Sequence, residues 1–178
     1  MAFGGGVTPA IGIRLGGSFT AGSYLNQGVT DQLPPGHQWN EYRERVLAFD
    51  ASVSRGYVEL RAETVFSSYE VPAVSDPVRG NITFLEGKYT FTPRFFTAIR
   101  LERNAYAFIR PRGPGNWQAR QTTFYDGELG LGFRLDARTL VKGSVRLDDW
   151  RVSPPLTAFL HNGTALAIQI SRGFEFPD

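Results

Sequence analysis

The chain has 178 residues, a formal net charge of +2 and 42% hydrophobic residues, which fits one folded domain and excludes a disordered tail. It contains no cysteine and only two histidines, so disulfides and thiol catalysis are excluded, and we expect no metal and no cofactor. The 17 arginines and two lysines are spread along the chain, so we expect no nucleic-acid partner, and no stretch approaches the ~18 apolar residues of a transmembrane helix.

Residues 1–6 have neither the basic segment nor the apolar segment of a signal peptide. They contain Gly4-Gly5-Gly6, but no helix signal follows that would make this run a phosphate-binding loop. We therefore expect residues 1–10 to be an N-terminal extension that precedes the folded domain.

From residue 11 onward, hydrophobic and polar residues alternate with a period of two, which is the pattern of β-strands with one apolar face. In the clearest segment, Leu129, Leu131 and Phe133 alternate with Glu128 and Arg134. About eight long strands are expected, at residues 11–25, 41–54, 57–69, 81–91, 95–105, 121–135, 139–150 and 163–176. The chain is therefore expected to be all-β, with no room for a substantial helix.

The connections between these strands are alternately long and short. The short ones are Arg55-Gly56, residues 92–94 and residues 136–138, and the long ones are residues 26–40, 70–80, 106–120 and 151–162. An antiparallel up-and-down meander places all short turns at one end and all long loops at the other, and an even strand count brings both termini to the short-turn end. Bacterial outer-membrane β-barrels have this asymmetry.

The apolar face has two possible neighbours, because alternation alone does not separate a membrane barrel from a soluble β-sandwich or barrel. Strands of ten residues or more favour tilted membrane strands, since soluble strands average ~5–6 residues. Aromatic residues near strand ends, such as Tyr69, Phe91 and Trp150, favour the girdles of a membrane barrel. We expect a transmembrane β-barrel over residues 11–176, with the lipid bilayer as its partner.

Two strand–turn–strand units carry a resemblance to a known family. EGKYTFTPR at residues 86–94, followed by AIRLE at 98–102, resembles units of bacterial outer-membrane porins, as does ELGLGFRL at 128–135 followed by LVKGS at 140–144. Residues 165–176 look like the closing strand of such porins, which usually ends at an aromatic residue, although Pro177 and Asp178 follow Phe176 here. The resemblance implies a location in the bacterial outer membrane, and either the C-terminal portion of a larger porin or a compact relative.

The polar face of the expected barrel would line its lumen. The candidate lumen-lining residues are Arg14, Arg61, Lys88, Arg100, Glu102, Glu128, Arg134, Lys142 and Arg146. Positive and negative side chains nearly balance on this face, so the wall predicts no strong ion preference, and the same charges could pair as a structural network. Eight strands enclose a space filled by their own side chains, whereas an open channel needs ~16, so a channel would require other barrel strands or subunits.

These observations predict a porin-like channel for passive diffusion of small hydrophilic solutes. Two alternatives stay open: a closed eight-strand outer-membrane barrel with a structural or surface-binding role, and a soluble β-barrel or sandwich that binds a ligand. Enzymatic activity is not expected, because His37 and His161 both lie in loops, where histidines are usually solvated.

Overall fold

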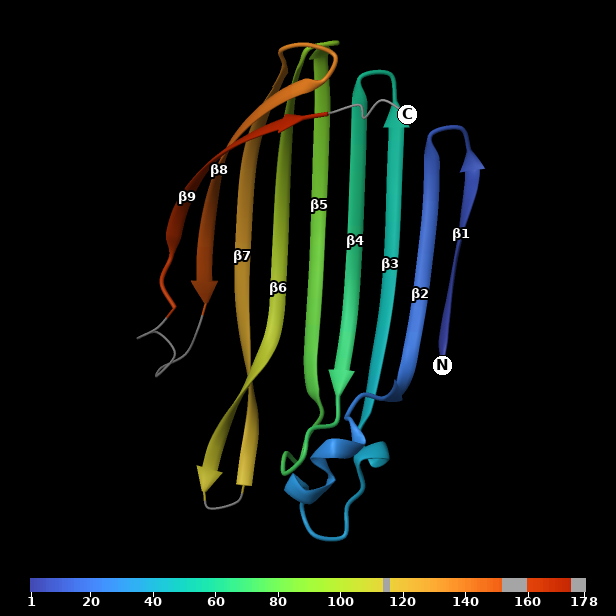
Figure 1. Cartoon of the computed structure of the whole chain (residues 1–178), viewed down its shortest axis with the longest axis vertical. Coiled ribbons are helices and arrows are strands. Elements are labelled where there is room, and N and C mark those ends of the chain that lie inside the picture. The colour runs from blue at the N-terminus through green and yellow to red at the C-terminus, as the bar shows by residue number, and fades with distance from the viewer. Residues whose placement is uncertain (114–115, 152–159, 174–178) are drawn as a thin grey trace.

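The computed structural model describes residues 1–113, 116–151 and 160–173, and among these the side chains outside residues 110–121. The described residues form one antiparallel sheet whose strand order follows the chain (Figure 1). The strands are β1 (Ala2–Ala10), β2 (Ile13–Ser23), β3 (Arg43–Arg55), β4 (Val58–Tyr69), β5 (Val78–Thr92), β6 (Phe95–Gly113), β7 (Asn116–Arg134), β8 (Thr139–Arg151) and β9 (Gly163–Arg172). Two 3-10 helices, η1 (Gln27–Gln32) and η2 (Trp39–Glu41), lie between β2 and β3. The expected all-β antiparallel meander is confirmed.

Glycine forms two of the tight turns at one end of the sheet. Gly12, between β1 and β2, has a φ of +81°, and Gly56, between β3 and β4, has a φ of +61°. Side-chain-bearing residues rarely adopt this left-handed conformation, which two-residue hairpin turns require. At Gly12 a Cβ would also overlap the carbonyl oxygen of Ser54, whose amide donates to the Gly12 carbonyl at 2.7 Å. These turns fix the register of the strands that they join.

The structure corrects the expectation for residues 1–10, which form β1 and not an extension. β1 pairs with β2 along its length, starting at Ala2 opposite Thr20. Three consecutive glycines lower the β-propensity of the segment, so its pairing with β2, and not its side chains, makes it a strand. With this ninth strand, the start of β1 at Ala2 and the end of β9 at Arg172 lie at opposite ends of the sheet (Figure 1). The expectation that both termini share the short-turn end is wrong for this reason.

The loop expected at residues 106–120 is mostly a β-hairpin. β6 and β7 continue past the expected strand ends, with Tyr106 opposite Thr122 and Gly113 opposite Asn116. Pro111, which favoured a loop, lies next to a register shift in this pair, and such irregularities tolerate proline. The expected loop at 151–162 and the end of the last expected strand, at 174–176, fall largely outside the described residues.

The sheet has two unlike faces and almost no interior. Among the described residues only Tyr42, Ala105, Thr122, Phe124, Asp126 and Gly132 are buried. One face, called here the apolar face, presents large hydrophobic side chains from strand to strand, including Leu15, Leu47, Phe66, Leu85, Leu101, Leu129, Leu147 and Ile168. The sheet is open, because β1 and β9 are its two edges and do not pair with each other.

Candidate functional site: the charged face of the sheet

The nine candidate residues of the sequence analysis all lie on the face opposite the apolar face, called here the charged face. Residues that oppose each other in antiparallel strands share a face, and so do residues two apart along a strand. The register links Arg14 on β2 to Arg146 on β8 through directly opposed residues in every intervening strand.

A row of alternating charge crosses the charged face. From β4 to β8 the opposed residues are Arg61, Glu86, Arg100, Glu128 and Arg146. Opposite charges on directly opposed residues stabilise a sheet by roughly 0.2–1 kcal/mol per pair. The register therefore places cations and carboxylates of the candidate set next to each other, as a structural network would.

The adjacent row, toward the long loops, is acidic. Its charged members are Asp50, Glu63, Glu102, Asp126 and Asp148, with Phe84 between the second and the third. Three of its pairs oppose carboxylate to carboxylate, an arrangement that is unfavourable by itself. Arg100 and Arg146 of the alternating row offset this repulsion for Glu102, Asp126 and Asp148 by reaching across to the acidic row.

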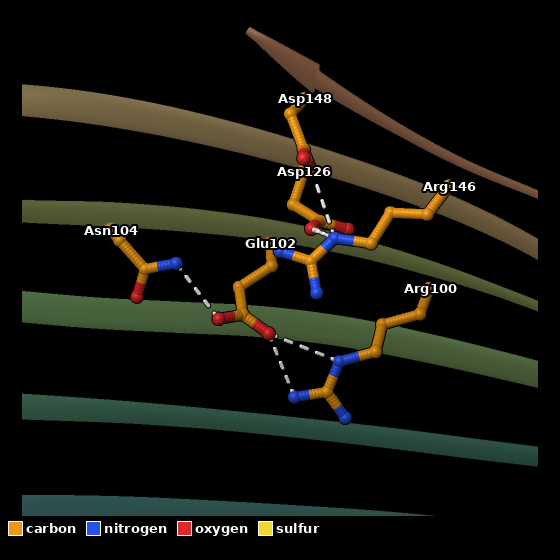
Figure 2. A network of polar contacts seen from close by, with 6 residues as sticks. All are labelled: Arg100, Glu102, Asn104, Asp126, Arg146 and Asp148. Carbon is orange, nitrogen blue, oxygen red and sulfur yellow. Dashed lines mark hydrogen bonds and ion pairs between the residues drawn. The ribbon is translucent and has the colours of Figure 1, made fainter. Parts of the chain in front are cut away.

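Figure 2 shows this compensation around Arg100 and Arg146. The Arg100 guanidinium donates to Glu102 Oε2 through Nε at 3.1 Å and through Nη2 at 2.8 Å. Arg146 pairs with Asp126 and, at 2.9 Å from its Nε, with Asp148. The Asp126 side chain is only 5% exposed, so this pairing replaces water around a buried carboxylate.

Three members of this network, Asn104, Asp126 and Asp148, are not among the nine candidate residues. The Asn104 side-chain amide donates to Glu102 Oε1 at 2.8 Å and so holds the carboxylate from the side opposite Arg100 (Figure 2). The signal for Asn104 was present, because it lies two residues after Glu102 on the same face of β6. Asp126 and Asp148 also alternate onto the charged face in the sequence, but the burial of Asp126 depends on neighbouring strands and has no sequence signal.

A hollow of about 620 Å³ lies on the charged face, on the short-turn side of the alternating row. Its cationic lining is Arg61, Lys88, Arg100, Arg134 and Lys142, and its acidic lining is Glu59, Glu86 and Glu128. Lys88 Nζ lies 3.0 Å from Glu59, and Arg100 lies 3.6 Å from Glu86. Among the described residues, Arg134 and Lys142 make no ion pair, so the hollow carries uncompensated positive charge.

Aromatic side chains gather at the long-loop end of the charged face. The Tyr24 and Tyr69 rings meet edge to face at 5.4 Å, and the Phe124 and Trp150 rings lie 4.4 Å apart. The Tyr24 hydroxyl donates to the Glu70 carbonyl at 3.0 Å, and burial raises the pKa of this hydroxyl above its usual range. These contacts tie the segment between β2 and β3 to the segment that follows β4.

The histidines stand apart from this network. His37 Nδ1 lies 2.9 Å from Glu41 Oε2, and both side chains are about half exposed. In the part of the chain that the structure describes, no group of three or more His, Asp or Glu side chains is arranged to hold a metal ion. The described helices are also too short and too polar to cross a membrane.

The chain was compared with protein-family models, with curated proteins and with solved structures, and none of the three comparisons gave a match.

Proposed function

We propose that this sheet is part of the wall of a bacterial outer-membrane β-barrel, with the apolar face toward lipid and the charged face toward an aqueous lumen. Small hydrophilic solutes would diffuse through that lumen without energy input. The resemblance to porin strand–turn–strand units supports the proposal, and so do the exposed apolar face, the strand lengths and the open edges of the sheet.

The observation that carries the proposal is the exposure of the apolar face. Ile168 is 83% exposed and Leu131 is 51% exposed, and large hydrophobic side chains are exposed on this face from β1 to β9. In water this arrangement leaves an apolar surface far larger than monomeric soluble proteins tolerate. Contact with lipid removes that cost, because acyl chains are as apolar as leucine.

Strand length agrees with a bilayer. A tilted strand needs about 9–11 residues to cross the hydrocarbon region. The strands β2 to β9 have 10 to 19 residues, and β1 has nine. Every strand of the sheet is therefore long enough to cross.

Closure requires further strands, because lipid tolerates no unpaired sheet edge. Successive antiparallel strands alternate in direction, so β1 and β9 run the same way. A ring with only antiparallel neighbours has an even number of strands, so this sheet needs an odd number of additional ones. Reaching the ~16 strands of an open channel requires about seven, supplied by further segments or subunits.

The test is reconstitution of the full chain into planar lipid bilayers, with recording of single-channel currents. We expect ohmic conductance and a protein that needs detergent to remain monodisperse. A chain that stays monodisperse in buffer without detergent would overturn the membrane placement and favour a soluble β-protein. Stable insertion without conductance would instead favour a closed barrel with a structural or surface-binding role.

A further inference from the structure

Three arginines interrupt the apolar face near its long-loop end. Arg45 on β3 and Arg79 on β5 both oppose Ser68 on β4, and Arg103 on β6 opposes Thr83 on β5. Each lies on the face that carries Leu47, Phe66 and Leu101. We call Arg45, Arg79 and Arg103 the arginine border.

No carboxylate compensates the arginine border within the described residues. Arg61, Arg100, Arg146 and Arg151 each pair with an acidic side chain within 4 Å, whereas the three border arginines do not. All three are exposed. An exposed guanidinium that lies beside an apolar surface and has no carboxylate partner in the protein can bind an anion from outside the protein.

The border lies beside a hollow of about 400 Å³ on the apolar face. Arg45 and Arg79 line it together with Phe19, Leu47 and Phe66. Since the two arginines flank one strand, their Cα atoms are about 10 Å apart, and their long side chains can converge on one group between them. The hollow therefore combines an apolar floor with a cationic rim.

Arg103 is held in place by neighbouring polar side chains. Its Nη1 donates to Asn81 Oδ1 at 2.9 Å, and Asn81 Nδ2 donates to the Val65 carbonyl at 3.2 Å and to Thr64 Oγ1 at 3.3 Å. Thr64 and Thr83 are joined by a hydrogen bond of 2.8 Å between their hydroxyls. This network orients one guanidinium without neutralising it, because an amide oxygen carries no net charge.

We propose that the arginine border binds the phosphate of an anionic lipid whose acyl chain lies against Phe19, Leu47 and Phe66. Guanidinium groups bind phosphate through paired, charge-assisted hydrogen bonds, and the neighbouring apolar floor selects a lipid over a free anion. The inference rests on the proposed function in one respect, the contact of the apolar face with lipid. The inference adds the class of lipid that is bound. It also adds the position of the sheet in the bilayer, because the arginine border would lie at the level of the lipid headgroups at the long-loop end.

The test titrates short-chain phosphatidylglycerol into the full chain in dodecyl maltoside micelles and counts bound lipid by native mass spectrometry. We expect wild-type protein to prefer phosphatidylglycerol over phosphatidylcholine with the same acyl chains. The variant R45Q/R79Q should lose at least about tenfold in apparent affinity, because two charge-assisted contacts are removed. The variant R14Q/R134Q, which removes two unpaired arginines from the charged face, should bind like wild type.

Three outcomes would overturn the inference. The first is equal affinity of the wild type for phosphatidylglycerol and phosphatidylcholine. The second is an equal loss of phosphatidylglycerol affinity in R45Q/R79Q and R14Q/R134Q. The third is binding of inorganic phosphate alone with the same affinity as phosphatidylglycerol. The variant R45K/R79K keeps the charge but loses the paired donors, so it should retain only part of the preference. The single variants R45Q and R79Q replace R45Q/R79Q if that protein does not fold, and each should lose part of the preference. Channel currents from the same preparations distinguish failure of the lipid site from failure of the proposed channel. Conductance without a lipid preference would reject the lipid site at the arginine border and leave the proposed channel standing.

Discussion

Asp126 is the charged residue whose environment depends most on its partners. Its side chain is 5% exposed, it opposes two other carboxylates, and Arg146 is the cation that reaches it. A buried carboxylate left without its cation is costly, whereas a pair replaced as a whole is not. Arg146 therefore stabilises the sheet mainly because Asp126 is present.

Replacing this cation should destabilise the sheet. We expect R146Q to lower the free energy of unfolding by about 1–3 kcal/mol, because Asp126 and Asp148 lose their shared partner. Urea titration in detergent micelles measures the change, and R14Q, which removes an arginine without an ion pair, should change it by less than about 0.5 kcal/mol. Adding D126N to R146Q should restore part of the loss, and the absence of any restoration would contradict the assignment.

Among the elements of the fold, the turn between β1 and β2 depends most strictly on one residue. Gly12 has a φ of +81°, and a Cβ there would meet the Ser54 carbonyl. We expect G12A to destabilise the protein by about 1–2 kcal/mol, through the left-handed backbone and through displacement of β3. In urea titration G5A should have a much smaller effect, since no atom lies within 4 Å of the Cβ it adds.

The turn between β7 and β8 is sensitive to acid. Asp136 Oδ1 accepts hydrogen bonds from the amides of Arg138 at 2.7 Å and Thr139 at 2.8 Å, and these bonds hold its pKa below its usual range. A lowered pKa means that the carboxylate stabilises the turn above its ordinary value of 3.8 and loses this effect as the pH falls through the folded value.

Hydrogen exchange, corrected for intrinsic rates, measures this effect at the amides of Arg138 and Thr139. We expect their protection to be constant near neutral pH and to fall below pH 3.8, the ordinary value for the carboxyl. In D136N the same amides should show no such acid-dependent loss. Protection in the wild type that does not change with acid would contradict the role of this carboxylate.

At the scale of the whole molecule, the charge on the charged face is balanced in number but not in position. An acidic row lies on the long-loop side of the alternating row, and the uncompensated cations Arg134 and Lys142 lie on the short-turn side. The near balance of charge in the sequence therefore conceals a separation of the two signs along the strands. In the proposed channel, this separation would place the two signs at different depths.

Removing the two free cations should change ion selectivity. In a salt gradient across a planar bilayer, we expect R134Q/K142Q to shift the reversal potential toward cation selectivity relative to wild type, because field lines in a narrow lumen are focused by wall charges. The single variant R14Q should shift the reversal potential less, because Arg14 lies on β2 and does not line the hollow. Identical reversal potentials for all three proteins would show that the hollow does not face the conduction path.

The period-two pattern predicted which side chains share a face, because that assignment survives any shift of register by two residues. It placed Arg14 and Arg146 on one face, as the structure does. It could not pair Arg146 with Asp126, because the pair exists only in one register of β7 and β8. β1 was missed because its glycines carry no strand signal, and the hairpin around Pro111 was missed because proline signals a loop.

The open edge at β9 makes the chain prone to aggregation until further strands pair with that edge. Between Gly163 and Ser171 no residue is charged, so the edge lacks the lysines and other gatekeepers that keep exposed strands apart. In water, the β9 edges of two chains would pair with each other, and repeated pairing would build fibrils. On the proposed placement in a membrane, we therefore expect β9 to need shielding until further strands cover its edge.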